Sequence, residues 1–249
     1  MITKKEILDA IHGKMIISCQ AVEDEPLYVE EKSIMYLMAR AAKQAGTPAI
    51  RTSSIRDVIA IKEETGLPVI GLVKIQYPGY EGYITPTMKE VDDLVAAGSD
   101  VVALDCTLRK RGDGITVNEF IAQIKEKYPD LPVIAGNVAT GEATRDLIEA
   151  GADEICVKDM AGIGRPHFLG TTMSGYTDYT SKKDEPDYEL MERLAKDTDI
   201  PIIGEGKIHY PDQAVKALQT GVWAIVVGGA ITRPLEIAQR FQKAIEAGK

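Results

Sequence analysis

The chain has 249 residues, of which 45% are hydrophobic, and its 29 Lys and Arg against 38 Asp and Glu give a formal charge of −9. That length suits one domain over residues 1–249 and leaves little room for a second. The net negative charge disfavours nucleic acid or an anionic membrane as a partner. No apolar stretch reaches the roughly 20 residues of a membrane span, and the first residues lack a secretory signal's apolar core, so we expect a cytoplasmic protein.

Eight apolar, β-rich segments alternate along the chain with amphipathic stretches of helical spacing. We expect strands at 15–20, 49–53, 69–74, 101–106, 133–138, 154–158, 201–206 and 224–229. We expect the helices between and after them at 31–45, 55–65, 87–97, 116–127, 142–150, 187–197, 211–220 and 233–246. A first helix over 4–11 would close the barrel floor or pack outside. Eightfold alternation with unbroken Val/Ile strands predicts a (β/α)8 TIM barrel.

Residues 159–180 break this rhythm, because they are rich in Gly, Thr, Ser and Tyr without helical spacing. A loop of that length inside a compact domain is usually functional. Its position after the expected sixth strand predicts a lid on the active face of the barrel.

Polar residues end or follow the expected strands, where the βα loops of such a barrel surround one shared mouth. They are Gln20, Arg51, Lys74, Asp105, Asn137, Glu205 and Arg233. A single polar strand end is commonly a solvated terminus, but Lys and Glu embedded in apolar runs are rarely buried unpaired. The set therefore indicates one candidate site.

Lys74 follows a run of five apolar residues, 69–73, so burial should favour its neutral amine. Arg51, one strand away, would act in the same direction. A lysine of lowered pKa can carry a proton or form a Schiff base. The alternative is a structural salt bridge with Glu205. Asp105 either hydrogen-bonds a sugar hydroxyl or holds Lys74 by its charge.

The last two expected strands end in glycine-bearing loops, 204–207 and 228–230, and Arg233 follows at a helix start. Glycine lets backbone N–H groups close on an anion, and loops after strands seven and eight of such barrels often bind phosphate. We therefore expect Gly206, Gly228, Gly229 and Arg233 to bind a phosphate group.

A metal or disulfide framework is not expected, because the three cysteines, Cys19, Cys106 and Cys156, lack ligand spacing. Each cysteine is better explained as a small buried hydrophobic residue.

Motifs in order over nearly the whole chain resemble the N-acylglucosamine-6-phosphate 2-epimerases, also called N-acetylmannosamine-6-phosphate 2-epimerases. The matching segments include PVIGLVK at 68–74, GTT at 170–172, GYT at 175–177, GEGK at 204–207 and VGGAITRP at 227–234. Shorter matches lie at 17–21, 25–27, 50–51, 83–87 and 103–105.

The resemblance implies a cofactor-free barrel enzyme that interconverts N-acetylmannosamine 6-phosphate and N-acetylglucosamine 6-phosphate in amino-sugar and sialic-acid catabolism. It makes Lys74 the proton carrier at C2, with Glu205 assisting. It assigns the phosphate to the glycine loops and Arg233. Gln20, Arg51, Asp105, Asn137, Thr171 and Tyr176 would bind the sugar. The expected partner is a small phosphosugar, with a homodimer as a possible assembly.

Two features depart from the family pattern. Asn137 stands where the family has an aspartate, and asparagine cannot carry a proton. About a dozen residues, 158–169, are inserted before the Gly-Thr-Thr motif. Residues 135–153 and 162–164 are similar to inosine monophosphate dehydrogenase and GMP reductase barrels, although Cys156 precedes the glycine loop whereas their catalytic cysteine follows it.

Two alternatives follow from these departures. One is a phosphosugar-binding barrel with reduced or lost catalysis, and the other, ranked last, is a purine-nucleotide oxidoreductase.

Overall fold

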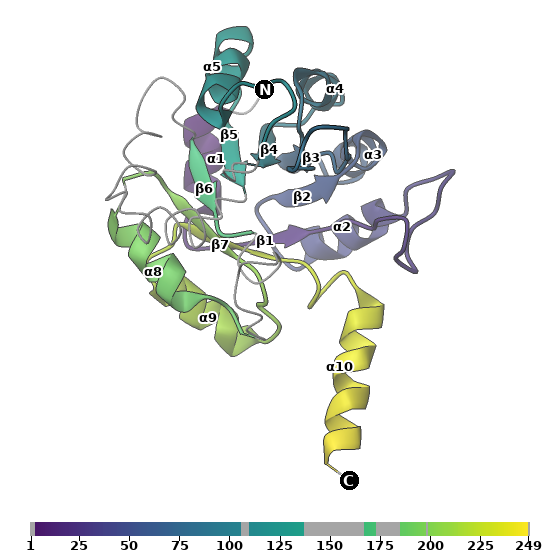
Figure 1. The fold of residues 1–249 in the computed structure, drawn as a ribbon. Helices are drawn as coiled ribbons and strands as arrows, with labels where there is room; N and C mark the ends of the chain where they lie inside the picture. Colours follow the sequence, from purple (N-terminus) through teal and green to yellow (C-terminus); the bar gives the residue numbers. More distant parts are fainter. Residues whose placement is uncertain (1–2, 106–109, 137–166, 173–184, 198, 249) are drawn as a thin grey trace.

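The computed structural model describes residues 3–105, 110–136, 167–172, 185–197 and 199–248. Its strands close into a parallel barrel in the order β1 to β8, and helices surround this barrel (Figure 1). The strands are β1 (Met15–Ser18), β2 (Ile50–Ser53), β3 (Val69–Leu72), β4 (Val101–Asp105), β5 (Val133–Gly136), β6 (Phe168–Gly170), β7 (Ile202–Glu205) and β8 (Ala224–Val227). The TIM-barrel prediction is confirmed.

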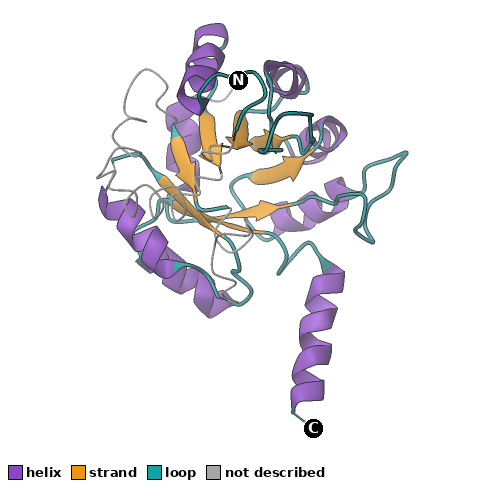
Figure 2. Ribbon diagram, viewed as in Figure 1, coloured by secondary structure: helices purple, strands orange, loops and turns teal. Residues whose placement is uncertain are grey.

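The described helices are α1 (Lys4–Ile11), α2 (Met35–Gln44), α3 (Ile55–Thr65), α4 (Met88–Ala96), α5 (Val117–Lys127), α8 (Tyr188–Asp197), α9 (Pro211–Gln219) and α10 (Pro234–Ala247). Each lies within a predicted helical stretch, apart from one residue at the end of α10. Figure 2 shows these helices in purple and the strands in orange. The predicted helix over 142–150 lies outside the described residues.

The sixth strand was assigned to the wrong segment. Between β5 and β7 the barrel uses β6, whose Phe168 pairs with Ile134 and whose Leu169 pairs with Ile202. The prediction had placed this strand at 154–158, which lies outside the described residues, and had included 168–170 in a loop. A strand of only three residues gives too short a pattern to be recognised, and its pairing on both sides defines it instead.

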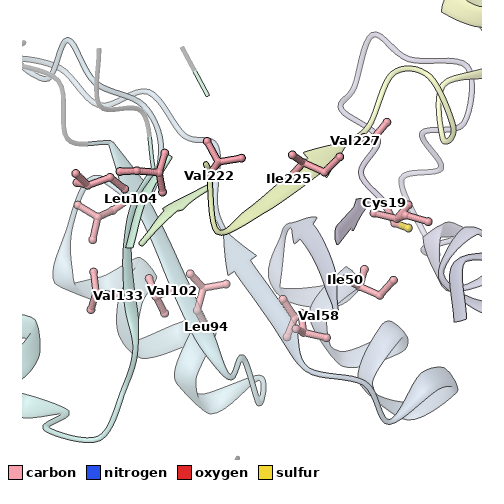
Figure 3. Packing of buried hydrophobic residues seen from close by; sticks show 14 of the residues in the cluster. Cys19, Ile50, Val58, Leu94, Val102, Leu104, Val133, Val222, Ile225 and Val227 are labelled. Atoms are coloured by element: carbon pink, nitrogen blue, oxygen red, sulfur yellow. The ribbon is translucent and has the colours of Figure 1, made fainter. Parts of the chain in front are cut away.

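Alternate residues of the strands face opposite sides of the barrel wall. One set, including Ile16, Ile70 and Leu72, forms a buried cluster inside the barrel. The other set, including Ile50 and Val102, packs in a second cluster against the surrounding helices (Figure 3). The same alternation continues beyond the end of each strand. The inward-facing positions there are occupied by polar side chains, which therefore lie at the mouth of the barrel.

The first helix closes the opposite end of the barrel. Ile7 and Ile11 belong to the interior cluster. The indole Nε1 of Trp223 donates to the carbonyl of Leu8 at 3.0 Å, and the N–H of Gly13 donates to the carbonyl of Trp223 at 2.8 Å. The first helix was expected either to close the floor of the barrel or to pack on its outside. In the structure it closes the floor.

The last helix, α10, stands away from the barrel (Figure 1). It buries no residue. Its apolar side chains Leu235, Phe241 and Ile245 are 47%, 69% and 55% exposed. In a (β/α)8 barrel the last helix usually packs against the outside of the barrel wall. In this chain α10 does not make that contact. Along the described parts of the chain, no helix is long and apolar enough to cross a membrane.

Gly71 gives a test of the packing between β3 and α4. An added Cβ would lie 2.4 Å from Ser99 Oγ and 2.8 Å from Leu94 Cδ2. We expect Gly71→Ala to lower the free energy of unfolding by about 1–3 kcal/mol through overpacking, measured by urea denaturation. Gly248→Ala is the matched control, since its Cβ would meet no atom closer than 3.5 Å, and should change stability by less than about 0.5 kcal/mol. Equal effects would contradict this account.

Candidate active site

A pocket of about 180 Å³ lies at the carboxyl ends of the strands. It brings together eight of the residues predicted from the sequence. They are Gln20, Arg51, Lys74, Glu205, Gly206, Gly228, Gly229 and Arg233. The common inward register of β1, β2, β3 and β7 explains why residues far apart in sequence meet here.

The other predicted residues lie elsewhere. Thr171 is fully buried beside the pocket, where its hydroxyl donates to the Glu205 carbonyl and accepts from the Glu205 N–H, both at 2.8 Å. Asp105 lies against Gly82, where an added Cβ would be 2.9 Å from Asp105 Oδ2. Asn137 and Tyr176 lie outside the described residues.

Lys74 is held by a backbone segment that crosses the ends of β3 and β4. It forms an antiparallel bridge with Ile84, and the N–H of Ile75 donates to the carbonyl of Tyr83 at 2.8 Å. The fully buried Thr85 fixes this segment, because its hydroxyl donates to the Ala103 carbonyl at 2.7 Å. We call residues 83–85 the strap. It covers the interior of the barrel beside Lys74 and limits its access to water.

The pKa of Lys74 is lowered to about 8, mainly because burial disfavours the charged ammonium. The positive charges of Arg51 and Arg233 act in the same direction, while Glu25 and Glu205 oppose them. Roughly a tenth of Lys74 is therefore a neutral amine at pH 7, and this is the form that can accept a proton.

Glu205 pairs with Arg51 and not with Lys74. Arg51 Nη1 lies 2.8 Å from Glu205 Oε2, and both side chains are more than nine-tenths buried. The hydroxyl of Thr172 donates to the other carboxylate oxygen, Oε1, at 2.5 Å. Two partners thus fix the Glu205 carboxylate in one orientation. The structural salt bridge between Lys74 and Glu205 that the sequence left open is not formed, because Glu205 pairs with Arg51 instead.

Gln20 lines the pocket and has an unused hydrogen-bond acceptor. Its Nε2 donates to Ser18 Oγ at 2.6 Å. Its Oε1 is buried and has no hydrogen-bond partner among the described residues. A buried unpaired oxygen costs free energy, so a donor supplied by a ligand would stabilise this arrangement.

The expected phosphate cradle is occupied by carboxylates of the chain itself. Arg233 contacts Glu25 Oε1 through Nε at 2.8 Å and Glu236 Oε1 through Nη1 at 3.0 Å. Glu236 also approaches Gly229, where an added Cβ would be 2.2 Å from its Oε2. An anionic side chain therefore already lies between the glycine backbone and the arginine.

Sequence reasoning missed several residues of this site. Thr172 was present in the recognised Gly-Thr-Thr motif but had no assigned role. Glu25 was likewise part of a matching segment, whereas Glu236 belonged only to an expected helix. Tyr83, Lys207 and His209 also line the pocket. Contacts between such distant residues carry no local sequence signal.

The fold and this site define a (β/α)8 barrel with a polar pocket at the carboxyl ends of its strands, the face on which such barrels build active sites. Residues 35–247 match the family described as "Putative N-acetylmannosamine-6-phosphate epimerase". The chain belongs to this family.

Curated relatives and a solved structure agree with this assignment. A relative from Caldanaerobacter subterraneus subsp. tengcongensis is 46% identical over 95% of this chain and 92% of its own length. Another, from Enterobacter sp. (strain 638), is 41% identical over 98% and 97%. Both are named "Putative N-acetylmannosamine-6-phosphate 2-epimerase". The N-acetylmannosamine-6-phosphate 2-epimerase structure from Clostridium perfringens is 40% identical, with a TM-score of 0.83 over 96% of each chain.

The electrostatic account of Lys74 can be tested with Arg51→Met. This change removes a positive charge and leaves Glu205 without its ion pair, and both effects should raise the pKa of Lys74 above about 8. Half-maximal labelling of Lys74 by an amine reagent, followed by peptide mass mapping, should shift to higher pH. Arg40→Met, which removes an exposed pair with Glu64, is the control and should leave the midpoint unchanged. An unchanged midpoint in Arg51→Met would refute this account.

Proposed function

We propose that this protein interconverts N-acetylmannosamine 6-phosphate and N-acetylglucosamine 6-phosphate by moving a proton at C2. The observation that carries this proposal is Lys74, a partly desolvated amine with a pKa of about 8 in a pocket that also holds a fixed Arg51–Glu205 pair. The names of the relatives supply the substrate.

Inversion at C2 requires the removal and return of one proton. In the open-chain sugar C2 lies next to the C1 carbonyl, so the neutral amine of Lys74 can take its proton while the C–H electron pair forms an enolate. Lys74, now an ammonium, and Arg51 stabilise the developing negative charge. Return of a proton to the opposite face gives the epimer. The proton that leaves C2 is replaced by a proton, so this step transfers no hydride and leaves the oxidation state of the sugar unchanged.

The neighbouring groups have supporting roles in this proposal. Gln20 would accept a hydrogen bond from the sugar through its unpaired Oε1. Glu205, oriented by Arg51 and Thr172, would assist Lys74. Asp105, Asn137, Thr171 and Tyr176 remain proposed substrate-binding residues.

The phosphate would lie at the loops after β7 and β8. Gly206, Gly228 and Gly229 would offer backbone to the anion, and Arg233 would give charge-assisted hydrogen bonds. The phosphate would then replace the carboxylate of Glu236, which now occupies this position next to Gly229. The net charge of −9 disfavours a nucleic-acid partner, so the positive charge that binds the phosphate would be local, as at Arg233.

The retained alternative is a phosphosugar-binding barrel without catalysis, suggested by Asn137. The comparisons do not favour it, nor do they favour a purine-nucleotide oxidoreductase. Solvent exchange at C2 separates an epimerase from a binding protein, because binding alone does not exchange the proton.

The deciding experiment is proton NMR of N-acetylmannosamine 6-phosphate with the protein in deuterium oxide. We expect C2-deuterated N-acetylglucosamine 6-phosphate, at a rate that rises with pH and levels off above about 8 as Lys74 loses its proton. Lys74→Ala should reduce exchange by at least about 100-fold. Lys89→Ala, at an exposed helix position, should keep the parent rate. Exchange retained in Lys74→Ala would refute the role of Lys74, and calorimetric binding without exchange in the parent would establish the alternative.

We further propose that the protein works as a cytoplasmic homodimer in which α10 packs on a second copy. In the closed barrel β8 pairs with β1, so the usual place of α10 is between α9 and α2. Both of those helices expose apolar side chains, Val215 at 57% and Leu37 at 43%. These residues and the bare apolar face of α10 are complementary, and reciprocal exchange between two copies would cover all of them.

Phe241→Lys tests this assembly. A lysine at the most exposed apolar position of α10 should shift the protein from dimer to monomer in analytical ultracentrifugation, because burial of its charge would be unfavourable. Lys243→Ala, on the same helix, should leave the dimer intact. A dimer that persists in Phe241→Lys, or a parent protein that is already monomeric, would contradict the proposal.

A further inference from the structure

Two carboxylates hold the guanidinium of Arg233 at the proposed phosphate cradle, and they come from different parts of the chain. Glu25 lies in the segment after β1, and its Oε1 is 2.8 Å from Arg233 Nε. Glu236 lies in the first turn of α10, and its Oε1 is 3.0 Å from Arg233 Nη1. The two segments meet because β1 pairs with β8. The mechanism described above uses Arg233 but assigns no role to Glu25.

Glu25 is the fixed partner of this arginine. Its backbone N–H donates to the carbonyl of Val22 at 2.8 Å, and its Oε2 accepts from the N–H of Val22 at 3.3 Å. Its carbonyl accepts from the N–H of Tyr28 at 2.8 Å. The side chain is 21% exposed. Backbone and carboxylate are therefore held together in one turn, with Oε1 against Arg233.

Glu236 is the displaceable partner. Its side chain is 41% exposed, and it reaches Arg233 from three residues further along the chain. Ion pairs of this exposed kind contribute little to stability, so the pair opens readily. Glu236 also approaches Gly229, where an added Cβ would be 2.2 Å from its Oε2. A phosphate group carries more charge and three acceptor oxygens, so it can replace this carboxylate in the cradle.

We propose that Glu25 is a positioning residue for the phosphate of the substrate: it holds Arg233 through Nε and leaves the terminal nitrogens of the guanidinium to the phosphate when Glu236 is displaced. This inference rests on the proposed function and adds a residue that sets the affinity for the substrate. The planar guanidinium binds phosphate well only in the correct orientation, because its donors form a rigid fork. A partner at Nε fixes that plane without using Nη1 or Nη2.

The backbone that carries Arg233 is fixed independently of Glu25. Thr232 is 2% exposed, and its hydroxyl donates to the carbonyl of Ser18 at 2.6 Å. The N–H of Thr232 donates to the carbonyl of Gly228 at 2.9 Å. Loss of the Glu25 carboxylate should therefore change the direction of the Arg233 side chain and leave the start of α10 in place.

Glu25 also acts on the other end of the pocket, through its charge. The charges that act on Lys74 include those of Arg51, Arg233, Glu25 and Glu205. The two arginines lower the pKa of Lys74 and the two glutamates raise it. Removing the charge of Glu25 should therefore lower the pKa of Lys74 below about 8. A loss of loop structure alone would not produce this shift.

The test compares the binding of inorganic phosphate to Glu25→Gln and Glu236→Gln by isothermal titration calorimetry. Both changes remove one negative charge beside Arg233, so electrostatics alone predicts tighter binding in both. We expect binding at least about 10-fold weaker in Glu25→Gln, because the amide NH2 of glutamine would face one of the two donors that the carboxylate accepts. Glu236→Gln should instead bind phosphate at least about 3-fold more tightly, since a weaker competitor occupies the cradle.

Two further readouts use the same variant. In Glu25→Gln the KM for N-acetylmannosamine 6-phosphate should rise by at least about 10-fold with less than about a 3-fold change in kcat, as expected for a loss of uniform binding. Half-maximal labelling of Lys74 by an amine reagent should shift to lower pH. Glu31→Gln is the control, because this exposed residue lies in the same segment after β1, and it should keep the parent values.

Glu25→Ala removes both contacts of the carboxylate, should act in the same direction and serves if Glu25→Gln does not fold. Phosphate binding that is unchanged or tighter in the Glu25 variants would overturn this inference, as would a parent protein that does not bind inorganic phosphate. Weaker phosphate binding in these variants, together with a parent that shows no C2 exchange, would keep Glu25 at the anion site and overturn only the epimerase.

Discussion

Closure of the barrel between β1 and β8 is the constraint on which the rest of the structure depends. A closed ring of parallel strands fixes the register of every pair, and register decides which residue of each strand faces inward. Ile16 and Leu72 fill the interior, and the next inward positions at the mouth are then Ser18 and Lys74. The packing of the core and the composition of the site are consequences of the same alternation.

In the pocket at the mouth of this barrel, the charge states of Lys74, Arg51 and Glu205 depend on one another. Lys74 has its lowered pKa because the strap limits water and because two arginines face it. The buried charge of Arg51 is compensated because Glu205 pairs with it, and Thr172 donates to the second carboxylate oxygen of Glu205. If Glu205 instead paired with Lys74, the pair would favour the ammonium and remove the amine needed for proton abstraction. The pairing of Glu205 with Arg51 is therefore a condition for the proposed proton transfer at Lys74.

The sequence predicted most of this fold because strands buried on both faces give continuous apolar runs and amphipathic helices give a clear period. It predicted the residues at the strand ends for the same reason, since Arg51, Lys74 and Glu205 interrupt or end such runs. It did not predict β6, because three residues between polar neighbours contain no period. The strap was also missed, since one bridge between Lys74 and Ile84 is formed by tertiary contacts rather than by a strand pattern.

The cradle and the last helix are physically linked, which would connect the proposed phosphate site with the proposed dimer. Arg233 immediately precedes α10, and Glu236 lies in its first turn. Because Arg233 contacts Glu25 while Glu236 touches Gly229, any movement of α10 changes the distances among these groups. A helix that buries nothing in its own chain can take its position from a second copy. The geometry of the phosphate end would then be set by the contact between two chains, whereas the Lys74 end is set within one barrel.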